Sequence, residues 1–219
     1  TYDNSLTAVI TSITPNFGSA YGGDTITIQG TGLTTGFSLS LEALFSSVTQ
    51  VVSGTQYTCV TEPKVFGSPD TFNAFISNNG VSIKDGVMFT QYYDWSNPET
   101  WQGDFPPQNG DSVLIPKGMN VVVDSEKVGL LRAVIVEDTY FKPEVNPLHV
   151  RTFDAEYILV HDGGLLQIGT EADPYTSKLI ITMHGDRKTL KIPTYGNKVI
   201  AIRHATLDIH GAPIDKVKS

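Results

Sequence analysis

Three acidic residues, Asp162, Glu171 and Asp173, are of the type that sugar hydrolysis requires. A glycan hydrolase places two carboxyl groups across the bond that it cleaves, one as the acid and the other as nucleophile or base. Asp162 also precedes Gly163 and Gly164, and Asp-Gly-Gly is typical of a tight turn in which the aspartate bonds its own backbone. We favour the turn, and we expect no catalytic residue in the chain.

Asp208 and His210 form a candidate metal site. They are two residues apart on an expected strand, so their side chains point to the same side. Imidazole nitrogen and carboxylate oxygen are common zinc ligands, and His204 or His184 from a neighbouring strand can complete such a site. In the alternative, His210-Gly211 is a turn whose imidazole bonds a backbone carbonyl. An isolated Asp-x-His pair is weak evidence, so we expect no metal and no cofactor.

Trp95 and Trp101 are the candidate ligand-binding residues, six apart beside Pro98. Exposed aromatic rings stack on sugar rings. The two tryptophans can equally pack over one end of a domain core, and we favour the packing role.

Charge and motifs exclude several functions. The chain has 15 Lys+Arg against 23 Asp+Glu, a net charge of −8, which argues against nucleic acid and anionic membranes as partners. It contains no apolar run long enough to span a membrane, so we expect no membrane contact by this segment. It also lacks a Gly-x-Ser-x-Gly elbow and a P-loop lysine. Cys59 is the single cysteine, so no internal disulfide is available.

The distribution of charge predicts two domains. Charged residues number 8 in residues 1–92 and 30 in the remaining 127. A shift of this size predicts domains at residues 1–92 and 93–219.

The first domain has the pattern of a small antiparallel sandwich. Short runs of alternating apolar and polar residues, such as Thr25–Gln29, are bounded by Gly, Pro or Asn. We expect Ile26 and Ile28 to face the core, and residues 78–80 to form a hairpin turn.

The motifs Ile13–Gly18, Gly22–Leu33 and Cys59–Pro63 resemble the IPT/TIG module across roughly residues 6–92. The resemblance implies an immunoglobulin-like sandwich. Extracellular members often pair a second cysteine with the one that matches Cys59. Because this chain has none, we interpret Cys59 as a buried apolar residue.

The second domain has short strands that recur at short intervals, separated by turn residues. The expected strands are Ser112–Ile115, Asn120–Val123, Ala133–Val136, Tyr157–Val160, Leu179–Thr182 and Leu207–Ile209. The segment Ser125–Arg132 forms at most a helical turn or two. The pattern predicts a parallel β-solenoid or a related roll, so the whole chain is predicted to be all-β.

Residues 94–219 resemble a G8 domain, through the motifs Asp94–Trp101, Pro107–Gly118, His161–Gly169 and Leu207–Gly211. The order IPT/TIG then G8 is similar to the large cell-surface proteins of the fibrocystin type. G8 domains also occur in hyaluronan-depolymerising proteins. There an arginine precedes the residue that matches Asp162 by eight positions, and here that position is Asp154, with Arg151 close by. This charge reversal argues against hyaluronan cleavage.

We therefore expect a non-enzymatic structural or adhesion segment of a longer extracellular or cell-surface protein. Its expected partners are other extracellular proteins, neighbouring copies of the same protein, or glycans. The alternative is a fragment of a glycan-depolymerising enzyme.

Overall fold

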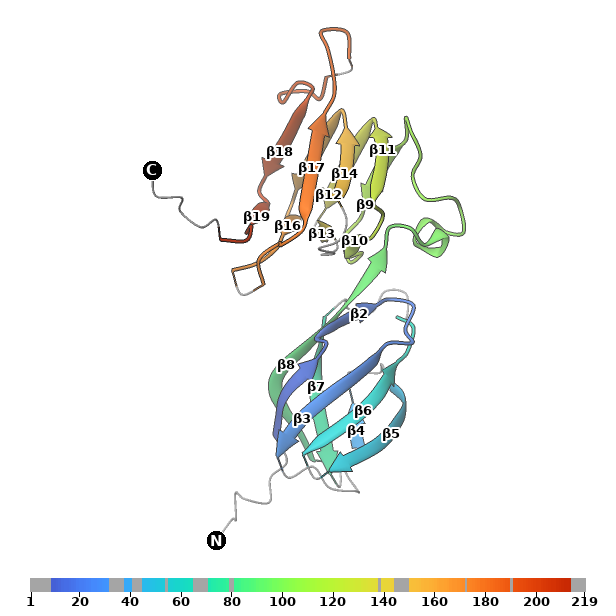
Figure 1. Ribbon diagram of the computed structural model, residues 1–219, viewed down its shortest axis with the longest axis vertical. Coiled ribbons are helices and arrows are strands. Elements are labelled where there is room, and N and C mark those ends of the chain that lie inside the picture. Colours follow the sequence, from blue (N-terminus) through green and yellow to red (C-terminus); the bar gives the residue numbers. More distant parts are fainter. Residues whose placement is uncertain are drawn as a thin grey trace. The chain divides into compact units, whose positions relative to one another are not determined.

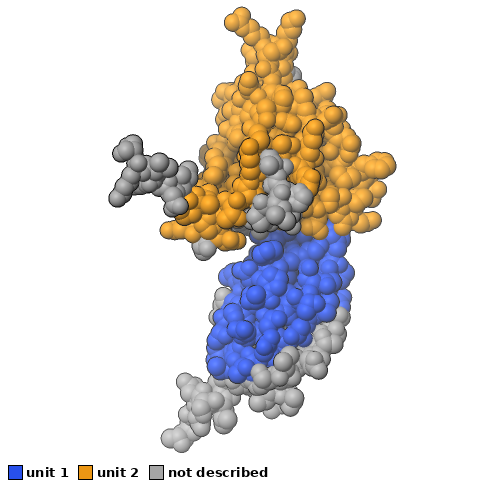
Figure 2. All heavy atoms as spheres, viewed as in Figure 1, with its two compact units in different colours: residues 1–92 blue, residues 93–219 orange. Residues whose placement is uncertain are grey.

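The computed structural model describes residues 9–31, 38–40, 45–53, 55–64, 71–78, 81–137, 139–143, 150–171, 173–189 and 191–213. The chain divides into two compact units, Thr1–Tyr92 and Tyr93–Ser219 (Figure 2). The described residues contain strands and one short 3-10 helix, η2 (Pro98–Trp101), and they include no helix with the length and apolarity needed to cross a membrane. The predicted all-β class is therefore confirmed.

The first unit has two groups of strands (Figure 1). One is an antiparallel sheet in the order β1 (Val9–Thr14), β3 (Thr25–Thr31), β6 (Gln56–Thr61), β5 (Phe45–Ser53). In the other, β7 (Thr71–Asn78) pairs antiparallel with β4 (Ser38–Ser40) and β8 (Val81–Asp94), and β2 (Phe17–Ser19) runs parallel to β8.

The core of the first unit follows from alternation along its strands. Ile26 and Ile28 on β3 are fully buried, whereas the threonines between and beside them are more exposed. Cys59 on β6 lies opposite Ile26, is fully buried and has no disulfide partner. Both expectations are confirmed. Residues 79 and 80 of the expected hairpin turn lie outside the described residues, but the strands on either side pair antiparallel, with Asn78 opposite Val81.

A glycine pair shapes the turn before β3. Gly22 and Gly23 both have positive φ, at 71° and 85°. Gly22 donates to the Ser19 carbonyl oxygen and Gly23 to the Thr61 carbonyl oxygen. Gly22 lies so close to the backbone of Glu62 that a Cβ there would be 2.5 Å from its carbonyl carbon. Only a glycine fits at this position.

The second unit is a parallel β-solenoid with three faces (Figure 1). The first face is formed by β9 (Ser112–Ile115), β12 (Ala133–Glu137), β15 (Tyr157–His161) and β18 (Val199–Arg203). The second is formed by β10 (Val121–Val123), β13 (Tyr140–Pro143), β16 (Leu165–Ile168) and β19 (Thr206–Ile209). The third is formed by β11 (Lys127–Leu131), β14 (Val150–Ala155) and β17 (Lys178–Met183). Each of the first three coils contributes one strand to each face in turn, and the fourth contributes β18 and β19 to the first two faces.

The solenoid core consists of apolar side chains stacked in register from coil to coil. Ile115, Val136 and Val160 occupy matched positions on β9, β12 and β15, and all three are fully buried. We call such a set an interior column. Glu137 and His161, which directly follow Val136 and Val160, point outward because strand side chains alternate.

The segment Ser125–Arg132, for which the sequence allowed at most a helical turn or two, contains a strand, because residues 127–131 form β11. Val128 and Leu131 are buried, and β11 pairs with β14. A shift in register between these two residues places both of them in the core although they are three apart. This spacing also occurs on a helical face, which explains why the sequence did not identify the segment as a strand.

The connection from β17 to β18 is the longest described corner, spanning residues 184–198 apart from residue 190. It begins with a turn in which the Asp186 carboxylate accepts hydrogen bonds from the backbone N–H groups of Lys188 and Thr189, at 2.7 and 3.1 Å. Further on, Ile192 and Gly196 exchange two backbone hydrogen bonds. The N–H of Gly196 donates to the Ile192 carbonyl oxygen, and the N–H of Ile192 donates to the Gly196 carbonyl oxygen. The corner is thus closed by its own hydrogen bonds.

Candidate functional site

Asp162 lies at the corner between β15 and β16, on the first residue of an Asp-Gly-Gly turn. Asp162 and Gly163 have positive φ values of 48° and 98°, and the N–H of Gly164 donates to the His161 carbonyl oxygen. The turn is tied to the next coil, because Asp162 and Gly163 donate backbone hydrogen bonds to the carbonyl oxygens of Arg203 and His204. The backbone of this corner is therefore held on both sides.

The Asp162 carboxylate pairs with the preceding histidine. Its Oδ2 lies 2.9 Å from Nδ1 of His161, and this hydrogen bond is the main reason that the pKa of Asp162 is below its ordinary value. The nearby charges of Arg203 and His204 lower the pKa in the same direction. Asp162 thus bonds a side chain here, where the sequence pattern favoured a bond to its own backbone.

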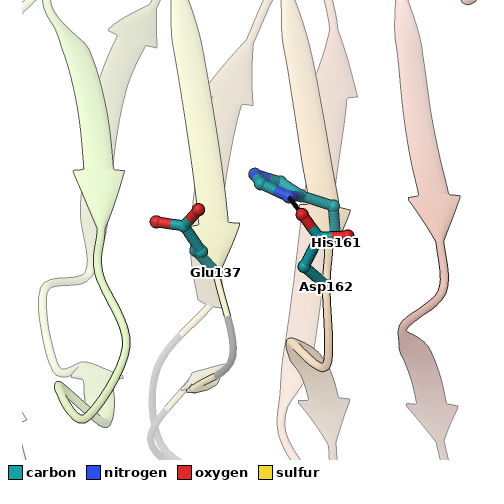
Figure 3. Close-up of side chains that lie close together, drawn as sticks. All are labelled: Glu137, His161 and Asp162. Atoms are coloured by element: carbon teal, nitrogen blue, oxygen red, sulfur yellow. Dashed lines mark hydrogen bonds and ion pairs between the residues drawn. The ribbon is translucent and has the colours of Figure 1, made fainter.

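Glu137 completes a cluster with these two residues (Figure 3). It is the last residue of β12 and lies opposite His161, the last residue of β15, in the parallel ladder. Glu137, His161 and Asp162 each offer one ligand atom, and these atoms lie within 4.8 Å of one another. Glu137 and His161 are partly buried, and Asp162 is exposed.

Glu171 and Asp173 lie at a different corner from Asp162. They follow β16, whereas Asp162 precedes it, and a strand of four residues is about 10 Å long. Asp173 belongs to a local turn in which its N–H donates to Oγ1 of Thr170 and its carbonyl oxygen accepts from the N–H of Thr170. In the described part of the chain, the group of three that contains Asp162 includes neither Glu171 nor Asp173.

Asp154 and Arg151 both lie on β14 but face opposite ways. Arg151 is buried and donates a hydrogen bond to the carbonyl oxygen of Asp124, so its guanidinium is committed to the core. Asp154 points outward and bonds Nε2 of His184 at 3.1 Å. Arg151, three residues before Asp154 in the sequence, therefore does not present its positive charge at the surface beside Asp154.

Asp208 and His210 pair with each other, Oδ1 to Nε2, at 2.8 Å. The other carboxylate oxygen of Asp208 accepts from Nε2 of Gln167, its neighbour on β16, at 3.0 Å. Among the described residues, neither His204 nor His184 joins this pair in a group of three potential metal ligands.

Trp95 and Trp101 pack together in an edge-to-face arrangement, with ring centroids 4.9 Å apart and an interplanar angle of 72°. Nε1 of Trp101 donates to the Trp95 carbonyl oxygen at 2.8 Å. Trp95 is buried in the solenoid core, where its ring also contacts Phe153, and Trp101 is partly buried beside it. Trp95 thus has no exposed face for a sugar ring.

The interior columns of the second face end at exposed side chains. Leu166 and Ile168 on β16 are buried, but Leu207 and Ile209, their partners on β19, are 44% and 57% exposed. Leu207 and Ile209, which we call the open column end, form an apolar surface at the edge of the solenoid.

Sequence reasoning missed Glu137. Glu137 precedes His161 by 24 residues, and His161 precedes Arg203, its partner on the other side, by 42. The unequal spacing hides the coil repeat. Aligning the coils on their apolar strands would have placed Glu137 beside His161.

Comparisons with known proteins agree with this architecture. The family model described as "G8 domain" matches residues 100–219, and the one described as "IPT/TIG domain" matches residues 8–92. Fibrocystin-L of Homo sapiens is 32% identical over 220 residues, which cover 98% of this chain and 5% of the relative. Fibrocystin-L of Mus musculus is 34% identical over 223 residues, 99% of this chain and 5% of the relative.

Fibrocystin of Mus musculus is 32% identical over 133 residues, which cover 61% of this chain and 3% of the relative. The chain thus spans only about a twentieth of the length of the fibrocystin-L relatives. The predicted pair of domains is confirmed: the chain belongs to the G8 domain family, carries an IPT/TIG domain before its G8 domain, and is homologous to fibrocystin-L and fibrocystin.

Proposed function

We propose that this chain is a non-enzymatic structural and adhesion segment of a larger extracellular or cell-surface protein. In this role it makes contacts with other extracellular proteins, with neighbouring copies or with glycans. The observation that carries the proposal is the homology with fibrocystin-L through both domains, and the open column end offers an apolar surface on which a further layer of protein can pack.

The fibrocystin relatives support this proposal. The alignment with fibrocystin-L runs through both domains of the chain, so the chain corresponds to one short stretch of a much longer relative. The separation of Asp162 from Glu171 and Asp173 also supports it, since a glycosidase holds its two carboxyl groups across one bond.

Self-association of the 219-residue chain tests the contact. A second copy that packs on the open column end would bury Leu207 and Ile209, and each buried side chain contributes about 1.5–3 kcal/mol. Analytical ultracentrifugation is expected to show concentration-dependent association, weakened about tenfold or more by the double substitution Leu207→Ser, Ile209→Ser.

Leu114→Ser is the matched control. Leu114 is 54% exposed on the outward side of β9, so its exposure is like that of the open column end, but it belongs to no interior column. The control is expected to associate like the unaltered protein. The proposed contact would be contradicted if the unaltered chain stays monomeric. It would also be contradicted if Leu114→Ser weakens association as much as the double substitution does.

A second candidate function, glycan cleavage, rests on a different pair of acids. The Glu137 and Asp162 carboxylates have oxygen atoms within 4.8 Å of each other, close to the separation of about 5–5.5 Å between the carboxyl groups of retaining glycosidases. Incubation with hyaluronan tests this alternative.

A further inference from the structure

The corner that carries Glu137, His161 and Asp162 has the donor set of a transition-metal site. One imidazole nitrogen and two carboxylate oxygens suit Zn²⁺, which binds histidine and Asp/Glu ligands at about 2.0–2.2 Å. Calcium and magnesium prefer oxygen ligands alone, so the histidine disfavours them.

The fold holds the three residues in place without an ion. Glu137 and His161 are neighbours in the parallel ladder, at the same height on adjacent strands. Asp162 is fixed by the hydrogen bonds of its turn to Arg203 and His204. Gly164 brings the turn against the preceding coil, since a Cβ there would lie 2.8 Å from the Val136 carbonyl oxygen.

Bound zinc requires only a small movement of side chains. Ligand atoms about 2.1 Å from an ion lie about 3.0–3.5 Å from one another in tetrahedral or octahedral geometry. The corresponding atoms are now within 4.8 Å of one another, and Glu137 and Asp162 are accessible enough to rotate. From these observations we propose that Glu137, His161 and Asp162 bind one Zn²⁺ ion at the edge of the first face, with at least one coordination position left open to solvent.

The charges around the corner set the strength of binding. Glu137 and Asp162 attract a cation, but Arg203 follows His161 in the same row, on the side opposite Glu137, and its charge acts on Asp162. Removal of this cation is expected to tighten zinc binding, because two like charges would no longer oppose each other there.

The other two His–Asp pairs of the second unit serve as internal controls. His184 bonds Asp154, and His210 bonds Asp208, so each pair offers the same two ligand types. Within the described residues, neither pair belongs to a group of three potential ligands. If zinc binding requires three ligands, substitution of His161 should weaken it, whereas substitution of His184 or His210 should not.

Calorimetric titration of the 219-residue chain with zinc chloride tests the proposal, after treatment with a chelator that is then removed. The expected result is one ion per chain. Glu137→Gln and His161→Asn should each weaken binding about tenfold or more, whereas His184→Asn and His210→Asn leave it unchanged. Arg203→Gln should tighten it. X-ray absorption of the zinc complex should show one imidazole nitrogen among oxygen ligands.

Thermal unfolding without zinc verifies that each variant is folded, and Glu137→Gln is the most conservative, because it replaces one carboxylate oxygen of a surface side chain with an amide nitrogen. With zinc, the unaltered protein should unfold at a higher temperature than without it, and folded Glu137→Gln should show a smaller increase. The proposal is overturned if the unaltered chain binds no zinc at micromolar concentrations. It is equally overturned if folded Glu137→Gln and His161→Asn bind zinc as tightly as the unaltered chain.

Discussion

Among the described residues of the second unit, histidine pairs with aspartate three times, and each pair arises differently from the fold. His161 and Asp162 are adjacent in the sequence, and Asp208 and His210 are separated by one residue. Asp154 and His184 are 30 residues apart and meet because β14 and β17 are neighbours in one ladder. In each pair the carboxylate fixes the orientation of the ring, and only at His161 is a further carboxylate within reach.

Cys59 is predicted to resist thiol reagents in the folded protein. Its side chain is fully buried, and burial raises the pKa of the thiol to about 12, so neither access nor thiolate is available. An aromatic disulfide reagent should label it only in denaturant, with Cys59→Ala as the blank. Rapid labelling of the native chain would show that β6 opens easily or is exposed.

The candidate site was predictable only where its residues are close in the sequence. The Asp-Gly-Gly turn at Asp162 is visible from residue types, because glycine and aspartate favour positive φ. The partnership with Glu137 depends on the register between β12 and β15, and the variable corner lengths conceal this register.

The glycine turn before β3 allows a prediction that separates strain from crowding. Gly22→Ala and Gly23→Ala both place a side chain at positive φ, a strain of about 1–2 kcal/mol. Only at Gly22 does the new Cβ meet backbone atoms, whereas at Gly23 nothing lies within 4 Å. Gly22→Ala should therefore lower the free energy of unfolding by about 1–3 kcal/mol more than Gly23→Ala. Urea unfolding measures the difference, and equal values would contradict the crowding.

The turn at Asp186 should make part of the stability depend on acid. Hydrogen bonds from the N–H groups of Lys188 and Thr189 lower the pKa of Asp186 from its ordinary 3.8. The ionised form therefore stabilises the fold fully above that ordinary value, and the contribution is lost as the pH falls through the lower folded value. Asp186→Asn keeps an acceptor oxygen and removes the charge. Thermal unfolding of both proteins between about pH 2 and pH 7 should show a deficit in the variant that shrinks toward acid; a constant deficit would exclude this origin.

The strands were predictable where alternation is strict and not where it is interrupted. Thr25–Gln29 alternates polar and apolar residues without a break, and it lies in strand β3. In β11, a register shift puts Val128 and Leu131 on the same side, so the pattern imitates a helix. The irregularity belongs to the pairing of two strands and is absent from either strand considered by itself.

At the scale of the whole molecule, the solenoid of the second unit arranges the outward residues of neighbouring strands in rows that run from coil to coil. Glu137, His161 and Arg203 form one such row, which runs from negative to positive across three coils. A substitution in a row acts first on its neighbours in the preceding and following coils, because those are the residues it contacts.

The whole chain is expected not to shorten hyaluronan. Its net charge of −8 repels a polyanion, and the outward carboxylate of Asp154 adds to the negative charge at the surface. Long hyaluronan incubated with the chain, with and without calcium, should keep its size on a gel. A longer protein that contains this chain is the necessary second sample, since residues outside these 219 can contribute to cleavage. Shortening that disappears with Asp162→Asn or Glu137→Gln would make this protein an enzyme.

The self-closed corner between β17 and β18 has a practical use for engineering. Its hydrogen bonds return the chain to the start of β18, where Val199 still pairs with Tyr157. We therefore expect the pairing between β15 and β18 to tolerate insertions of different lengths in this corner. A short peptide epitope grafted between Thr194 and Gly196 should be displayed to antibodies while the coils on either side keep their alignment, which makes this corner a convenient handle for capturing the protein.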